Sequence, residues 1–322
     1  MWAQQLVAPS TLAEVDVAAP TKDDLRGGEV LLEVLAGGVC GSDLPAFKGT
    51  AAAQGAAAGP DGPRPGAPLH EVVARVLAST DPAHEVGGRV VGWATGFDGL
   101  AERVISRGDD LAPVTTALAP ARAVLLQPLA CVLYAVEQLP RVRGANAAVV
   151  GLGPIGLLFA HVLRAAGATR VTGVDLVDRS AVASDFGLDE TVRASSDRWS
   201  AGIAAADRPD VIVEAIGHSA APLNHAIRAC APQGCVFAFG VPDDPIYPID
   251  VEAMLRRNLT LMSGITLERP RMLLAAADYL TAHPDLVDTY VTDVRPADQA
   301  QQAFAAAVRP APDQVKITLD YA

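Results

Sequence analysis

The stretch "NAAVVGLGPIGLLFAHVLRAAGA", residues 146–168, is the feature that most limits how this chain can fold. A short apolar run leads directly into a G-x-G-x-x-G pattern made by Gly151, Gly153 and Gly156, and an apolar helical pattern follows. This order predicts a strand, a tight turn and a helix whose N-terminus can bind phosphate. A second strand, "RVTGVD", completes a β-α-β unit. The segment therefore predicts a dinucleotide-binding fold.

The alternation of apolar strands and helical patterns continues beyond this unit. Continuous apolar runs, "PDVIVEAIG", "GCVFAFGV" and "NLTLMSGI", alternate with helical patterns up to residue 266. Unbroken apolar strands separated by helices are typical of a parallel sheet that is covered on both faces. We predict a doubly wound sheet of about six strands over residues 129–266, with a helix over "RSAVASDFGL", residues 179–188.

Asp175 ends the second strand, about twenty residues beyond the glycines, where an acidic residue accepts a ribose hydroxyl. Its carboxylate should repel a 2′-phosphate, which favours NAD, with NADP possible. The alternative is that Asp175 caps a following helix. Arg179 is expected to flank the ribose. The other residues that we expect at the cofactor are Pro154, Ile155, Gly217, Val241 and Ile265.

Residues 1–120 differ in character, because short strand-like runs such as "EVLLEVLAGGV" and "GGRVVGWATG" are broken by glycine and proline. Residues 49–68 are nearly all Ala, Gly and Pro, so we expect a surface loop, either a plain linker or a flexible lip over a cleft. The last segment holds two helical patterns and a closing strand, "QVKITLDY", and looks like a return to the first domain.

Charge and cysteine usage exclude several classes of protein. The net charge is −12 with no basic cluster, which argues against a nucleic-acid partner. No apolar run approaches a membrane span, and no secretory leader pattern is present, so a cytoplasmic address is expected. The cysteines, Cys40, Cys131, Cys230 and Cys235, form no C-x-x-C pair. We expect thiols or single metal ligands, with Cys230 and Cys235 buried as small apolar residues.

Six motifs together resemble the medium-chain dehydrogenase/reductase family, the zinc alcohol and polyol dehydrogenases. They are "GGVCGSD", "PLHE", "GGRVVG", "QPLACVLYAV", "VVGLGPIG" and "VIVEAIG". The resemblance covers essentially the whole chain. It implies an α/β protein with a Rossmann domain at 129–266 and a GroES-like, mainly-β catalytic domain at 1–128 and 267–322. It also implies a homodimer formed through the edge strand "NLTLMSG".

The resemblance implies roles for the residues of the first motifs. Cys40, His70 and Glu71 match the ligands of a catalytic zinc with an open fourth position. Ser42 matches the hydroxyl that takes the substrate proton, and Asp43 matches the carboxylate that orients the metal's histidine. Gln127 is expected beside these residues, and we call the site formed by Cys40, Ser42, His70, Glu71 and Gln127 the catalytic corner.

The chain departs from the family pattern at four positions near this corner. Leu69 replaces the glycine before the histidine, Gln127 replaces a glutamate, Tyr134 replaces a histidine, and Pro45 stands where relatives carry a histidine. Relatives also insert a lobe with four clustered cysteines. No cysteine lies between Cys40 and Cys131 here, so no structural zinc is expected.

We therefore expect an NAD-dependent, zinc-assisted dehydrogenase that interconverts a secondary alcohol and its ketone. The alcohol is a polyol, a sugar, a cyclitol or a natural-product intermediate. One alternative is a zinc-free NADPH-dependent quinone or enoyl reductase, against which Cys40, His70 and Glu71 argue. The other is a non-catalytic dinucleotide-binding protein, which Gln127 favours.

Overall fold

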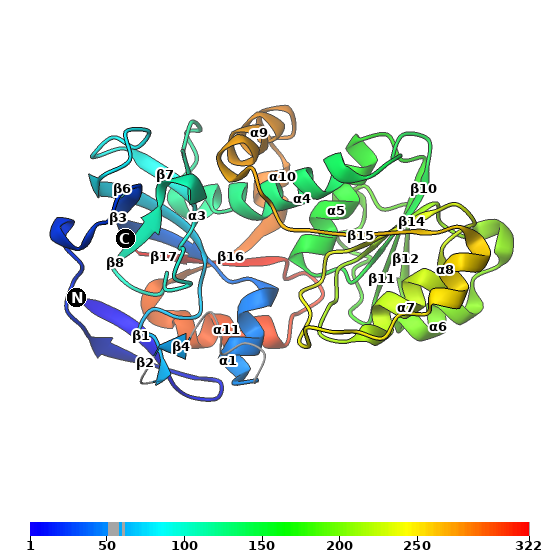
Figure 1. Ribbon diagram of the computed structural model, residues 1–322, viewed down its shortest axis with the longest axis horizontal. Helices are drawn as coiled ribbons and strands as arrows, with labels where there is room; N and C mark the ends of the chain where they lie inside the picture. Colours follow the sequence, from blue (N-terminus) through cyan, green and yellow to red (C-terminus); the bar gives the residue numbers. More distant parts are fainter. Residues whose placement is uncertain (51–57, 60–61, 322) are drawn as a thin grey trace. The chain divides into compact units, whose positions relative to one another are not determined.

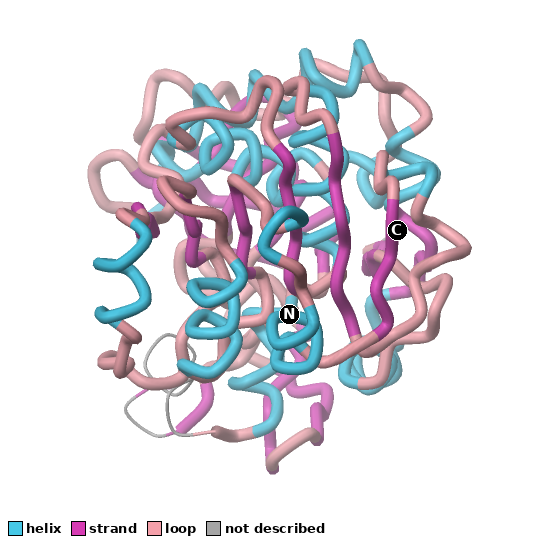
Figure 2. The backbone as a smooth tube through the Cα atoms, turned by 90° about the vertical axis from the view of Figure 1, so that its right-hand side faces the viewer, coloured by secondary structure: helices cyan, strands magenta, loops and turns pink. Residues whose placement is uncertain are grey.

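A computed structural model describes residues 1–50, 58–59 and 62–321 of the chain, and the remaining residues are grey in Figure 2. The described chain forms two compact units. Unit 1 contains Met1–Cys131, Leu267–Pro310 and Gln314–Ala322, and unit 2 contains Val132–Thr266 and Ala311–Asp313. The loop expected at residues 49–68 lies largely outside the described residues.

Unit 2 is built on a six-stranded parallel sheet with the order β12-β11-β10-β13-β14-β15. Its strands are β10 (Asn146–Val150), β11 (Arg170–Asp175), β12 (Glu190–Arg193), β13 (Val211–Glu214), β14 (Cys235–Ala238) and β15 (Thr260–Ser263). The order reverses between β10 and β13, so the carboxyl ends of these two strands open a crevice where Rossmann folds bind dinucleotides. The predicted doubly wound sheet is confirmed.

Helices cover both faces of this sheet, as Figure 1 shows. Helix α5 (Pro154–Ala165) packs on β10 and β11, while α6 (Ser196–Gly202), α7 (Ala220–Ala229) and α8 (Val251–Arg257) belong to the other layer. The core of that second layer joins sheet residues Val150, Ile212 and Val236 to Trp199 and Ile227 of the helices. Burial on both faces explains the unbroken apolar runs of the sequence.

One local prediction for unit 2 was wrong, and one strand was missed. The helix expected over residues 179–188 is a series of turns with one 3-10 helix, η5 (Ser184–Phe186). The backbone N–H of Val182 donates to Arg179 and that of Ala183 to Ser180, so each bond spans three residues and no α-helix forms. Strand β12 was missed because it has only four residues, lies at the sheet edge and is polar at every position except Val192.

Unit 1 contains a seven-stranded sheet with the path β16-β17-β3-β6-β7-β9, and β8 also pairs with β3. Its strands are β3 (Glu29–Gly38), β6 (Glu71–Ser79), β7 (Arg89–Trp93), β8 (Arg103–Arg107), β9 (Leu111–Pro113), β16 (Val291–Pro296) and β17 (Lys316–Asp320). Strand β17 pairs with β3 through Thr318 and Gly38, so the predicted return of the C-terminal strand is confirmed.

Smaller elements complete the two units. Strands β1 (Trp2–Ala8) and β2 (Thr11–Asp16) form a hairpin, and β4 (Ala58–Gly59) pairs with β5 (Gly62–Pro63). The remaining α-helices are α1 (Leu44–Lys48), α3 (Pro120–Ala123), α4 (Leu126–Gln138), α9 (Arg269–Ala282), α10 (Leu286–Tyr290) and α11 (Ala300–Val308). The 3-10 helices are η1 (Lys22–Asp24), η2 (Gly41–Asp43), η4 (Gly108–Asp110), η6 (Ala205–Asp207) and η7 (Ala297–Gln299). Among the described residues, no helix is long and apolar enough to cross a bilayer.

Asp110 is a buried carboxylate that joins three segments of unit 1. Its Oδ1 lies 2.6 Å from Arg269 Nη1 and 3.1 Å from Arg107 Nη2, and its Oδ2 accepts a 2.6 Å hydrogen bond from Thr95 Oγ1. Burial raises the pKa of Asp110, but the bonds from Arg107 and Thr95 and the charge of Arg269 outweigh it, so the pKa falls below its ordinary value.

We predict that Asp110→Asn lowers the free energy of unfolding by about 1–3 kcal/mol at pH 7. Because the folded state depresses this pKa, the stabilisation is present above the unfolded carboxyl pKa and is lost as pH falls through the folded value. Urea unfolding at pH 7 and near pH 3 should show the difference between wild type and variant shrinking in acid. The exposed neighbour, in Asp109→Asn, is the control, and an equal loss in both variants would contradict the assignment.

Candidate active site

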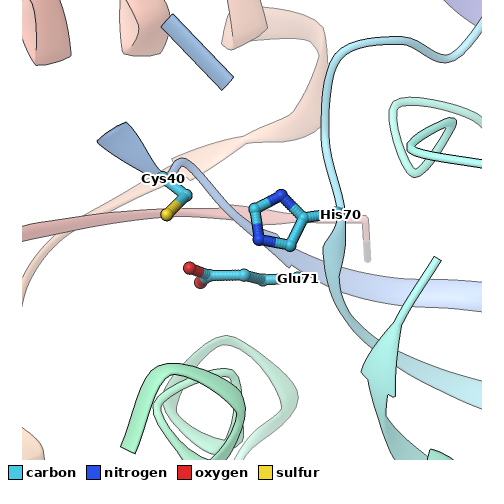
Figure 3. A group of neighbouring side chains, drawn as sticks. All are labelled: Cys40, His70 and Glu71. Carbon is cyan, nitrogen blue, oxygen red and sulfur yellow. The ribbon is translucent and has the colours of Figure 1, made fainter. Parts of the chain in front are cut away.

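Three side chains with metal-ligand chemistry converge in unit 1, as Figure 3 shows. One ligand atom from each of Cys40, His70 and Glu71 lies within 4.8 Å of the others. Cys40 follows β3, and Glu71 begins β6. These strands run antiparallel with Gly38 opposite Glu71, so the sheet register brings the cysteine loop and the His-Glu pair together.

One carboxylate connects two of these residues. Asp43 is 1% exposed, its Oδ2 accepts a 3.0 Å hydrogen bond from the backbone N–H of Cys40, and its Oδ1 lies 2.7 Å from His70 Nδ1. With Nδ1 bonded to a carboxylate, the imidazole presents Nε2 as its free ligand atom. The structure thus brings Asp43 into contact with the predicted histidine ligand.

Glu71 is fully buried, and among the described residues neither of its carboxylate oxygens accepts a hydrogen bond. Lys316 Nζ lies 2.6 Å from Oε2 as an ion pair, and both side chains are 1% exposed. A buried carboxylate that lacks hydrogen bonds needs cations nearby. Beside a thiol and an imidazole, the unpartnered Oε1 fits a divalent metal such as zinc.

The pKa values of two cationic groups respond to this negative charge. Burial lowers the pKa of His70, but the charge and hydrogen bond of Asp43, with Cys40, outweigh it and hold the pKa well above its ordinary value. Burial likewise lowers the pKa of Lys316, while the charges of Glu71 and Cys40 raise it more. Lys316 is therefore an ammonium ion at neutral pH.

The two other predicted catalytic residues also lie in unit 1. Ser42 Oγ donates to Cys40 Sγ at 3.4 Å, so its hydroxyl lies beside the candidate ligand. Gln127, in the first turn of α4, is 2% exposed, and its Nε2 donates to Cys131 Sγ at 3.5 Å. The amide nitrogen of Gln127 is thus directed at a thiol one helical turn away.

Leu69, which replaces a glycine, is accommodated by two glycines. A Cβ atom added at Gly37 or at Gly99 would lie 2.7 Å from Leu69 Cδ2. The Leu69 side chain is fully buried and occupies the space that Gly37 and Gly99 leave open. On another side of the corner, the Phe97 ring lies 5.2 Å from the His70 ring, with Phe97 at a φ of 56°.

Two residues near this corner were missed by the sequence analysis, namely Lys316 and Tyr290. Lys316 stands in the closing strand, where a lysine within an apolar run was the available signal. Tyr290 ends α10, and its side chain is fully buried. Nothing in the sequence around Tyr290 indicated that it approaches the metal corner.

The glycine motif of unit 2 has the geometry that a pyrophosphate requires. Gly151 has a φ of 96°, which favours glycine, and Gly153 forms the N-cap of the twelve-residue helix α5. A Cβ atom at Gly153 would meet open space, while one at Gly156 would lie 1.8 Å from the carbonyl oxygen of Gly151. The turn leaves room for a phosphate at the helix N-terminus, and Pro154 and Ile155 lie in its first turn.

Asp175 lies at the carboxyl end of β11, next to the glycine turn. Its Oδ2 accepts a 2.6 Å hydrogen bond from the backbone N–H of Leu152, and its Oδ1 accepts one of 2.8 Å from Val177. Since no α-helix follows β11, the alternative of a helix cap does not apply. Arg179, predicted beside the ribose, is 2% exposed, and its Nη1 donates to the carbonyls of Ala311 and Pro312. These bonds hold residues 311–313 in unit 2.

Three further predicted cofactor residues follow the remaining strands at the same sheet edge. Gly217, at a φ of 68°, follows β13, Val241 follows β14, and Ile265 follows β15. Val241 and Ile265 are 51% and 68% exposed, although both are apolar. Glu214 holds the turn at Gly217 by accepting two backbone hydrogen bonds at Oε1.

Comparisons with known proteins agree with this geometry. The family model "Zinc-binding dehydrogenase" matches residues 154–280. The chain is 30% identical to D-altritol 5-dehydrogenase of Agrobacterium fabrum over 300 residues, which cover 81% of this chain and 82% of the relative. It is 29% identical to L-threonine 3-dehydrogenase of Bacillus velezensis over 151 residues, 46% of this chain and only 43% of that protein. The solved structure of alcohol dehydrogenase TADH from Thermus sp. ATN1 shares the fold, with a TM-score of 0.82, 22% identity and 100% coverage of both chains.

A substitution at Gly38 shows whether the packing around Glu71 determines the position of its carboxylate. A Cβ atom at Gly38 would lie 2.3 Å from Glu71 Oε2 and 2.5 Å from Val124 Cγ1, whereas one at Gly41 would meet nothing within 4 Å. We predict that Gly38→Ala lowers the free energy of unfolding by about 1–3 kcal/mol and weakens zinc binding, because the carboxylate must move. Denaturant unfolding and zinc titration check both effects. Gly41→Ala is the matched control, and equal behaviour of the two variants would be evidence against this packing.

Proposed function

The chain belongs to the medium-chain dehydrogenase/reductase family of zinc-binding alcohol and polyol dehydrogenases, and from this premise we propose that it uses zinc and NAD to oxidise a secondary alcohol to its ketone. It is an oxidoreductase that acts on CH–OH groups. The observation that carries the zinc proposal is the convergence of Cys40, His70 and Glu71 around a carboxylate without hydrogen bonds. A polyol is the favoured substrate class, since Ser42 and Gln127 add polar groups at the corner.

Cys40 Sγ, His70 Nε2 and the Glu71 carboxylate would hold the metal, while Asp43 fixes the imidazole. Bound zinc supplies a Lewis acid that lowers the pKa of an alcohol hydroxyl, and bound NAD supplies the hydride acceptor. Ser42 relays the hydroxyl proton, because its Oγ lies directly beside a candidate ligand and can accept that proton while its own proton passes to water. The Lys316 ammonium group compensates the negative charge of the buried Glu71 carboxylate. The alcohol carbon loses a hydride and becomes the ketone.

The dinucleotide would lie along the carboxyl edge of the unit 2 sheet. The N-terminus of α5 and the open space at Gly153 would receive the pyrophosphate. The Asp175 carboxylate would accept from the adenosine ribose hydroxyls and repel a 2′-phosphate, which supports NAD. A ribose contact by Arg179 stays a prediction, since its guanidinium is bonded to backbone carbonyls.

A zinc-free reductase is the second candidate, and one contact favours it. The Lys316 ammonium already lies 2.6 Å from Glu71 and neutralises its charge without a metal. The thiol and imidazole beside this pair favour zinc, because a reductase that works without metal has no use for them. Metal content separates the two candidates.

We further propose a homodimer formed through β15. This strand is the edge of the unit 2 sheet, so one side of its backbone is available to pair with a second copy. The apolar side chain of Ile265, just beyond β15, is 68% exposed.

We predict that the purified protein binds about one zinc ion per chain and oxidises secondary polyols with NAD. Cys40→Ala should lose both zinc and activity, because it removes the only thiolate ligand. Ser42→Ala should keep the zinc and lose about 10²–10⁴-fold in kcat, the usual contribution of a side chain that transfers a proton in the transition state. Metal analysis and steady-state kinetics check these outcomes. A protein without zinc that reduces quinones or activated alkenes with NADPH would overturn the proposal.

Asp175 should set the choice between NAD and NADP. We predict that Asp175→Ala raises the ratio of NADP to NAD efficiency by about tenfold or more, since the repulsion of a 2′-phosphate disappears. Asp178→Asn is the control, because Asp178 is a partly exposed carboxylate three residues away. Steady-state kinetics with each dinucleotide measure the two efficiencies, and titration followed by NAD(P)H fluorescence measures the two affinities. Unchanged selectivity in the Asp175 variant would remove it from the ribose site.

A further inference from the structure

Tyr290 lies beside the strand that carries the cation partner of Glu71. It is the last residue of α10, and the next residue, Val291, begins β16 opposite Lys316 in the register with β17. Lys316 in turn lies 2.6 Å from the Glu71 carboxylate. The Tyr290 side chain is fully buried. The sheet therefore places a buried phenol next to the candidate metal corner.

The hydroxyl of Tyr290 has no hydrogen-bond partner among the described residues. By contrast, the hydroxyl of Tyr321, on the same unit, donates a 2.6 Å bond to the carbonyl of Gly99. Leaving a buried hydroxyl unpaired costs free energy, so native proteins seldom do so. An uncommitted donor in a fully buried place therefore points to a partner that binds or moves into reach.

The surroundings of Tyr290 identify the chemistry of that partner. Burial raises the pKa of Tyr290, and the negative charges of Glu71, Cys40 and Cys131 raise it further, to well above its ordinary value. The hydroxyl therefore keeps its proton and is available as a hydrogen-bond donor. Of these groups, the Glu71 carboxylate is also without a hydrogen bond.

Three other polar side chains of this site already have partners. Ser42 Oγ donates to Cys40 Sγ, and Gln127 Nε2 donates to Cys131 Sγ. The Asp43 carboxylate accepts from Cys40 and contacts His70. Two buried hydroxyls near this site, those of Tyr290 and of Thr318 on β17, thus have no hydrogen bond among the described residues.

We propose that Tyr290 is a positioning residue whose hydroxyl donates a hydrogen bond to the Glu71 carboxylate in the zinc-loaded protein. The inference rests on the proposed zinc site. A carboxylate that binds a metal through one oxygen leaves lone pairs to be filled, and a bond from a neighbouring donor holds the ligand in its orientation. Lys316 compensates the charge of Glu71 from one side, and Tyr290 fixes the direction of the carboxylate.

The test compares Tyr290→Phe with Tyr321→Phe in the full chain. We expect Tyr290→Phe to raise the zinc Kd by about tenfold or more, the usual effect of losing a group that orients a metal ligand. Tyr321→Phe should leave the zinc Kd unchanged. Competition with a chromophoric chelator measures the Kd. The visible absorption of the Co²⁺-substituted protein should change in Tyr290→Phe alone, because it reports ligand geometry.

Metal-free stability provides the second measurement. Without metal, Tyr290→Phe should unfold at the wild-type temperature or above it, since its hydroxyl is buried without a bond there, whereas Tyr321→Phe should unfold at a lower temperature. A wild-type zinc Kd and an unchanged Co²⁺ spectrum in Tyr290→Phe would overturn the inference while leaving the zinc site intact. So would a loss of metal-free stability equal to that of Tyr321→Phe. A wild-type protein that binds no zinc would instead overturn the proposed function, and the inference with it.

Discussion

The buried carboxylate of Glu71 is the constraint on which the catalytic unit depends. Its oxygens accept no hydrogen bond from the described residues, so its charge must be compensated by cations. Lys316 supplies one from the C-terminal strand, which requires β17 to pair with β3. Gly38 supplies the space, because any side chain there would collide with the carboxylate. Strand β17 and Gly38 thus both act on the same buried charge, because one brings its cation and the other leaves room for the carboxylate.

The sequence predicted the parts of the fold that depend on periodicity and glycine geometry. Unbroken apolar runs predicted the strands around Val149 and Val213, because both sheet faces are covered. The sequence did not predict the elements whose conformation depends on local hydrogen bonds or on a position at the sheet edge. The turns after Asp175 use bonds that span three residues, in place of the expected helix. Strand β12, Glu190–Arg193, is mostly polar and lies at the edge, so no apolar pattern marked it.

The site was predictable only for residues that sit in motifs. The spacing and family resemblance of Cys40, Ser42, Asp43, His70 and Glu71 predicted one corner, and the structure brings these residues together. Lys316 and Tyr290 were missed because they reach the corner through strand pairing more than 200 residues away along the chain. Such contacts depend on sheet register, which a single sequence does not reveal. Leu69 was noted as a departure, but its accommodation by Gly37 and Gly99 required the structure.

The central claim is that one thiolate, one imidazole and one carboxylate of this chain hold a zinc ion. X-ray absorption at the zinc K-edge tests it most directly, because sulfur scatters differently from nitrogen and oxygen. We predict one sulfur at about 2.3 Å and nitrogen or oxygen ligands at about 2.0–2.2 Å, with the sulfur signal absent in Cys40→Ser. A zinc shell without sulfur in the wild-type protein would contradict the account, and so would a protein that retains no zinc after dialysis.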